Sequence, residues 1–186
     1  MNERPRLSPL SWSSLDEGQR EIYQSVIGSR PVDPGNGGPL PGPFNAMLHS
    51  PDVGGPLERL GAAVRSTGSI PARAREIATL AVAVHMESDY EWLRHSQIAR
   101  NLGVSDADLQ LLRAAGQPDF PDPLERAVLR VTRILLAKSD LSDDEYEEAI
   151  AHLGEAGLVT LSTLVGYYRL LALQLRVFRV GLPVNL

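Results

Sequence analysis

Apolar residues recur at helical spacing along most of this chain, and nowhere do they alternate with polar residues over the length of a strand. Leu57, Leu60 and Val64, for example, follow one another three and four positions apart, which is typical of a helix with one buried face. The same spacing predicts helices over residues 15–28, 54–67, 71–87, 90–102, 105–115, 124–138, from 142 onward and over 154–179. The pattern therefore predicts an all-α fold, a helical bundle of seven or eight helices.

Polar residues mark several of the predicted helix starts. Ser14 followed by Glu17, and Ser142 followed by Glu145, have the spacing of a capping box, in which each side chain accepts a hydrogen bond from the other residue's backbone N–H. The last predicted helix is different because it is apolar on nearly all sides. A helix of that kind lies in the centre of a core or against another subunit, and we expect both.

The length of 186 residues predicts one domain over residues 1–186. Pro5 and Pro9 indicate an extended N-terminal arm over residues 1–13, since proline interrupts regular helix. A second irregular segment, the Pro/Gly loop 31–43, lies between two predicted helices. It is either a surface loop or a lid over a pocket, because long irregular loops in compact domains are often functional.

Charge and hydropathy narrow the expected partners. The net charge is −5 and the basic residues are scattered, so nucleic acid is not expected as a partner. The first twenty residues contain no apolar signal segment, and the longest uncharged run in the last helix, residues 156–168, is too short to span a bilayer. We therefore expect a cytoplasmic protein without a membrane partner. The chain has no cysteine, which excludes disulfides, thiolate nucleophiles and Cys-ligated metals.

Glu91 and His95 are the first candidates for chemistry, because they are four residues apart in SDYEWLRH. On a helix this spacing places both side chains on one face. A carboxylate beside an imidazole can accept, hold and return a proton near neutral pH. Glu76, nineteen residues before His95, is a second carboxylate for the same place. The alternative is a surface ion pair worth a few tenths of a kcal/mol.

The segment SDYEWLRHSQIARNLGV resembles the carboxymuconolactone decarboxylase family, which shares its fold with the AhpD-like alkylhydroperoxidases. PGPFNAMLHSPDVGGPLERLG, HMESDYEWLRH and LVGYYRLLALQLRVFRVGLP carry the resemblance further, over roughly residues 14–183. It implies an all-α fold and a homo-oligomer, either a trimer or a hexamer. In the AhpD-like branch the motif is C-x-x-C-x-x-x-H, and its cysteines fall on Ser88 and Glu91 of this chain. Thiol-based peroxide reduction is therefore impossible here.

That departure points to the cysteine-less decarboxylase branch, whose resemblance implies a cofactor-free lyase acting on a small carboxylated or enolisable molecule. No metal and no organic cofactor are expected. The resemblance implies that His95 is the acid/base and that Glu91 and Glu76 orient it and set its charge. A neighbouring carboxylate raises the pKa of a histidine by stabilising the imidazolium, so a protonated His95 would be the proton donor.

Five more residues are candidates for binding the substrate, each with an ordinary structural alternative. Tyr90 adjoins the Glu91–His95 pair but is also a natural pocket wall, and an arginine such as Arg94 is often simply exposed. His85 lies about 180° round an ideal helix from Glu76, so both face one pocket only if the helix ends early. The full set is Tyr90, His85, His49, Arg94 and Tyr167.

Several other functions stay open at this stage. A cyclase, dehydratase or isomerase would use the same His/Glu proton transfer, and a fold does not fix a substrate. A Cys-independent peroxidase is a weaker hypothesis because the chain shows no evident haem or flavin motif. The third possibility is a non-enzymatic oligomeric protein, in which Glu76, Glu91 and His95 form only a polar cluster or hold a metal such as iron.

Overall fold

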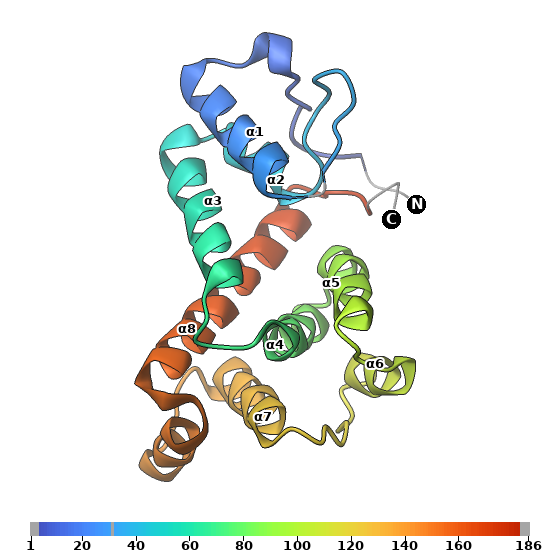
Figure 1. The fold of residues 1–186 in the computed structure, drawn as a ribbon. Helices are drawn as coiled ribbons and strands as arrows, with labels where there is room; N and C mark the ends of the chain where they lie inside the picture. The colour runs from blue at the N-terminus through green and yellow to red at the C-terminus, as the bar shows by residue number, and fades with distance from the viewer. Residues whose placement is uncertain (1–3, 31, 183–186) are drawn as a thin grey trace. The chain divides into compact units, whose positions relative to one another are not determined.

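A computed structural model describes residues 4–30 and 32–182, and these residues form eight α-helices and no strand (Figure 1). The predicted all-α fold and helix number are therefore confirmed. A short 3-10 helix over Trp12–Ser14 comes first. The α-helices are α1 (Glu17–Ser29), α2 (Pro43–Leu48), α3 (Pro51–Ser66), α4 (Ala72–His85), α5 (Asp89–Asn101), α6 (Asp106–Arg113), α7 (Pro123–Lys138) and α8 (Asp143–Val177).

The contacts divide the chain into two compact units, one made of residues 1–63 with 173–186 and the other of residues 64–172. One domain over residues 1–186 stays a prediction. The predicted arm 1–13 and loop 31–43 both belong to the first unit, and their residues 1–3 and 31 lie outside the described residues, as does Pro183. In the first unit α1 packs on α2, and a buried ion pair joins Arg30 to Glu58 at 2.7 Å.

In the second unit, α4 is the central helix and contacts α5, α6 and α7 (Figure 1). Its composition explains this position, since every residue from Glu76 to Ala83 is buried. A helix without a polar face must be covered on several sides. The core around it consists of Ile77, Leu80, Ala81, Ala99, Val104, Leu109, Leu112, Phe120 and Leu129, with Trp92 packed against it.

The connection between α4 and α5 is only three residues long, which makes the two helices antiparallel neighbours. Glu87 takes a left-handed conformation in the turn, with φ of 52°. Ser88 then caps α5, because its side chain accepts a hydrogen bond from the backbone N–H of Glu91. Folding back at this turn brings the middle of α5 alongside the middle of α4, so residues far apart in sequence become neighbours.

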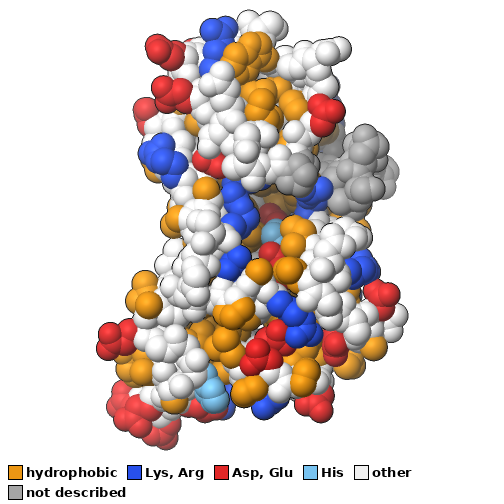
Figure 2. Space-filling view, viewed as in Figure 1, with side chains coloured by type: hydrophobic (Ala, Val, Ile, Leu, Met, Phe, Trp, Pro, Cys, Tyr) orange, Lys and Arg blue, Asp and Glu red, His pale blue; other side chains and the backbone are white. Residues whose placement is uncertain are grey.

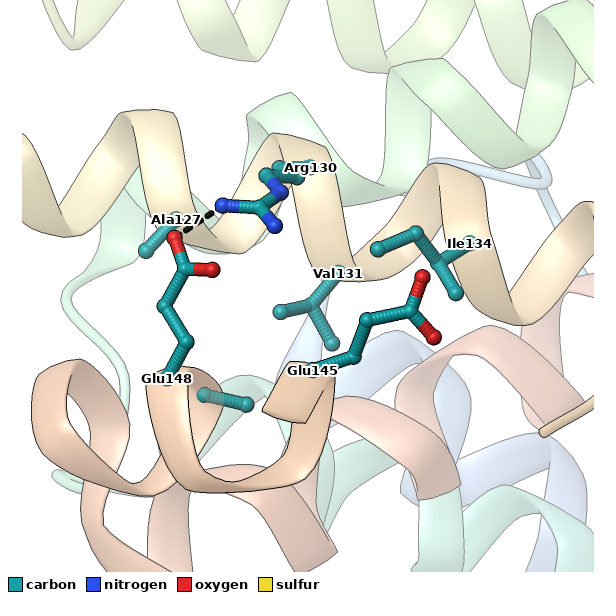
Figure 3. Close-up of a pocket in the computed structure, with 7 residues that line it drawn as sticks. Ala127, Arg130, Val131, Ile134, Glu145 and Glu148 are labelled. Atoms are coloured by element: carbon teal, nitrogen blue, oxygen red, sulfur yellow. Dashed lines mark hydrogen bonds and ion pairs between the residues drawn. The ribbon is translucent and has the colours of Figure 1, made fainter. Parts of the chain in front are cut away.

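The start of α8 packs on α7 (Figure 3), where Arg130 pairs with Glu148 over a small apolar floor that includes Val131 and Ile134. Acidic side chains gather on the surface over this end of α8 (Figure 2). Further along, Gly154 interrupts the helix with φ of 66° and ψ of 172°. By length and composition α8 alone among the described helices passes a test for a membrane span, but a core helix passes the same test.

One of the two predicted capping boxes is confirmed and the other is wrong. Ser142 and Glu145 form the predicted capping box, with hydrogen bonds of 2.9 and 3.3 Å. The box predicted at Ser14 is wrong, because Ser14 ends the 3-10 helix and α1 begins three residues later, at Glu17. There, Asp16 and Gln19 exchange the two capping hydrogen bonds. Asp accepts a backbone N–H as well as Ser does, so both sequence patterns were compatible with a helix start.

Candidate functional site

Three side chains of the second unit meet where α4 and α5 lie side by side. Nδ1 of His95 lies 2.6 Å from Oε2 of Glu76, and its Nε2 lies 3.3 Å from Oε2 of Glu91. The imidazole is thus held at both nitrogens by carboxylates. All three residues are at least nine-tenths buried, with exposures of 9% for Glu76, 4% for Glu91 and 8% for His95. The surface ion-pair interpretation of Glu91 and His95 therefore does not fit.

The charge of His95 is set by a competition between burial and its two partners. Burial by itself would lower the pKa of His95, since it disfavours the imidazolium. The negative charge of Glu76, its hydrogen bond and the contact with Glu91 outweigh burial and raise the pKa to about 10. His95 is therefore an imidazolium at neutral pH, and both of its N–H groups are donors.

The two carboxylates differ in how completely they are satisfied. Glu76 accepts the short hydrogen bond from His95. Glu91 makes the longer contact, and its second oxygen, Oε1, is buried without a hydrogen-bond partner among the described residues. A buried carboxylate oxygen without a donor is costly and uncommon. Glu91 is consequently the side of the cluster with spare capacity to accept a hydrogen bond.

Tyr168, and not its neighbour Tyr167 from the list of candidates, contacts the cluster. Its ring packs edge-to-face on the imidazole of His95, with centroids 5.0 Å apart and an angle of 85°. Tyr167, which was the predicted candidate, packs on the other tyrosine at 5.2 Å. Helical spacing can tell which of two adjacent tyrosines faces the site only when one face of the helix is buried. In this part of α8, Leu164, Val165, Tyr167 and Tyr168 are all buried, so the spacing does not separate the two tyrosines.

Two of the other predicted substrate-binding residues, Tyr90 and Arg94, lie on the same helix as Glu91 and His95. Tyr90 is buried at the start of α5, where burial and the charge of Glu91 raise its pKa to about 12 against the lowering effect of Arg94. Arg94 is half-buried, in contrast to the exposed arginine considered as its alternative. These two residues therefore lie near the Glu91 side of the cluster.

Neither of the two other predicted histidines joins the cluster. His85, the last residue of α4, is exposed and lines a separate groove with Val84, Arg133 and Leu136. His49 belongs to the first unit, where its Nε2 lies 2.9 Å from the carbonyl oxygen of Ser8.

The described residues contain no group of three or more His, Cys, Asp or Glu side chains arranged to hold a metal ion. His95 faces a carboxylate at each of its two nitrogens.

A sequence model of the carboxymuconolactone decarboxylase family matches residues 51–134, a segment that includes Glu76, Glu91 and His95. Residues 51–134 are therefore similar to the carboxymuconolactone decarboxylase family. The resemblance stated from the sequence is confirmed for this family segment, which runs from the start of α3 into α7.

Solved structures agree on the fold around the carboxymuconolactone decarboxylase segment. A peroxidase-related protein from Ralstonia eutropha with an alkylhydroperoxidase AhpD core superposes with a TM-score of 0.81 at 15% identity, covering 100% of this chain and 95% of its own. A protein from Agrobacterium tumefaciens, a putative antioxidant defence protein AhpD, gives 0.66 at 22% identity over 76% and 97%. The debrominase Bmp8 in complex with 2,3,4-tribromopyrrole gives 0.77 at 14% identity over 99% and 95%.

At these identities the solved structures establish the AhpD-like fold and nothing more. No curated protein matches the chain in a sequence search. The chemistry must therefore be argued from the residues of the carboxymuconolactone decarboxylase segment and their geometry.

Proposed function

We propose that this protein is a cofactor-free lyase that moves a proton with His95, Glu76 and Glu91 on a small carboxylated or enolisable substrate. The observation that supports the proposal best is the buried imidazolium held between two carboxylates, at 2.6 and 3.3 Å. Burial strengthens each of these interactions and excludes competing water. The family match is consistent with a decarboxylation of the carboxymuconolactone type.

Decarboxylation on this arrangement needs no added electron acceptor. The carbon–carbon bond to the carboxylate breaks, carbon dioxide leaves, and the electron pair passes into a conjugated carbonyl to form an enolate. His95 then delivers a proton to carbon through Nε2, the nitrogen that makes the longer contact. Glu76 stays on Nδ1 and stabilises the cation until transfer. Solvent then returns the proton to the imidazole.

Glu91 has a different task because it faces the nitrogen that transfers the proton. A substrate that enters beside Nε2 displaces the weaker Glu91 contact, which frees the carboxylate to accept a proton or to orient the substrate. The absence of cysteine excludes the alternative of a thiol peroxidase from these residues. Proton transfer is the chemistry for which the cluster holds all the groups.

Carbon dioxide release from 4-carboxymuconolactone, without added metal, tests the proposal. Wild type should release carbon dioxide and His95→Ala should lose most of that activity. His152→Ala is the matched control, since His152 is an exposed histidine on α8. No release by folded wild type would reject the lyase assignment for this substrate.

A further inference from the structure

Tyr168 contributes more than a packing ring to the cluster. It comes from α8, whereas the charged residues come from α4 and α5, and it is only 5% exposed. The edge-to-face contact with His95 fixes the ring against the imidazole. Within the described part of the chain, however, its phenolic oxygen makes no hydrogen bond, although buried tyrosines usually find a partner for this group.

The cluster also contains an acceptor without a donor. Oε1 of Glu91 is buried and has no partner among the described residues, and the Nε2 atom of His95 has only the 3.3 Å contact to Glu91. A buried polar group without a partner is uncommon in proteins. An enolisable carbonyl compound bound beside the cluster would supply a carbonyl oxygen that accepts a hydrogen bond from the phenol.

We propose that the Tyr168 hydroxyl donates a hydrogen bond to the carbonyl oxygen of the substrate and stabilises this oxygen as it becomes an enolate. The inference rests on the proposed proton-transfer function and assigns the site an oxygen-binding group. Tyr168 is then a catalytic residue. His95 protonates the carbon of the substrate, and Tyr168 donates a hydrogen bond to its carbonyl oxygen. The substrate class is narrowed to compounds with a carbonyl conjugated to the carbon that is protonated.

The charge of the surroundings supports a neutral donor. Burial, followed by the negative charges of Glu91 and Glu76, raises the pKa of Tyr168 well above 10. The phenol therefore keeps its proton over the whole range in which His95 is charged. A donor whose ring is already held in place stabilises developing charge with little reorganisation, and removing one such donor lowers turnover by about 10² to 10³.

Tyr168→Phe is the test, because it keeps the ring against His95 and removes only the hydroxyl. Two assays distinguish this inference from the lyase assignment. The first is carbon dioxide release from 4-carboxymuconolactone. The second is deuterium uptake from D2O into α-angelica lactone, an enol lactone without a carboxylate, which requires enolisation alone. Tyr146→Phe is the matched control, since Tyr146 is an exposed tyrosine on the same helix.

In each assay that wild type performs, we expect Tyr168→Phe to lower kcat by about 10²-fold to 10³-fold with a smaller change in KM. Tyr146→Phe should match wild type. Uptake of deuterium without carbon dioxide release, slowed by Tyr168→Phe, would support the inference while rejecting decarboxylation. Equal kcat for wild type and a folded Tyr168→Phe would overturn the inference, and so would a folded wild type inactive in both assays.

Discussion

Nδ1 of His95 on α5 lies 2.6 Å from Oε2 of Glu76 on α4, and this contact joins the two helices through a buried charge pair. Among the groups that raise the pKa of His95, Glu76 acts most strongly, through its charge and then its hydrogen bond. The proton on His95 therefore depends on a residue from a different helix. Three of the predictions below follow from this cluster.

Glu76→Gln should lower the pKa of His95 from about 10 towards 6.5, because the amide keeps a polar contact but loses the negative charge. NMR titration of the imidazole measures the change, and the missing signal in His95→Gln assigns it among the four histidines. His85 and His152 are exposed, and their signals are the references in the same spectra. An unchanged His95 titration would show that Glu76 does not set its charge.

Stability should fall as the pH rises through the alkaline range. The pKa of His95 is about 10 in the folded protein and near 6.5 when unfolded, so its stabilisation is complete below about pH 6.5. Between these values unfolding releases a proton, and the free energy of unfolding declines by up to ~1.4 kcal/mol per pH unit. Above about pH 10 the contribution is gone.

Urea unfolding of wild type and His95→Gln at about pH 6 and about pH 9 tests this linkage. The difference in stability between the two proteins should shrink at the higher pH, because only wild type has the titrating group. His152→Gln should follow wild type at both values, since His152 is exposed. A difference that stays constant with pH would mean that His95 is not protonated in the fold.

Glu91→Gln should separate activity from stability. The substitution keeps the size of the side chain but removes the carboxylate that faces Nε2 of His95. We expect turnover in the proton-transfer assays to fall by about 10² or more, as is typical for a positioned acid–base group. The midpoint of thermal unfolding should change little, because a buried carboxylate with an unpartnered oxygen contributes weakly to stability.

Glu147→Gln is the matched control for that experiment, since Glu147 is an exposed carboxylate on α8. It should leave both turnover and the unfolding midpoint as in wild type. A Glu91→Gln protein with wild-type turnover would remove Glu91 from the chemistry. A Glu91→Gln protein that unfolds would contradict the expected small change in stability.

The sequence was sufficient for the local parts of this site and not for the tertiary ones. Glu91 and His95 share one helical face, so their pairing follows from spacing alone. Glu76 was placed with them by the family resemblance, in which a glutamate lies about nineteen residues before the histidine. Tyr168 lies 73 residues after His95, on a helix buried on several sides, and no periodicity says which of its faces meets α5.

His85 is a second residue whose position could not be predicted from helical spacing. As the last residue of α4, it was placed near Glu76 only on the condition that the helix ended early. The structure keeps α4 regular up to His85, and the side chain accordingly lines a different groove. Tertiary packing decides which helices cover each face of a buried helix. The face that carries chemistry therefore cannot be read from the sequence of that helix alone.

The break in α8 gives the last prediction, because two of its glycines differ in one respect only. A Cβ atom built on Gly154 or on Gly166 would meet nothing within 4 Å. Gly154, however, has φ of 66° and ψ of 172°, a conformation almost restricted to glycine, whereas Gly166 has no such positive φ. Gly154→Ala should therefore destabilise the protein by about 1–3 kcal/mol.

Gly166→Ala should instead stabilise by about 0.5–1 kcal/mol, since alanine loses less backbone entropy in a helix interior. Chemical denaturation of both variants beside wild type measures the two values, and carbon dioxide release checks that the site is intact. Opposite signs would assign the break to backbone conformation. If Gly154→Ala were as stable as wild type, α8 would have to straighten at this position, and the segment before Gly154 would then leave the surface of α7.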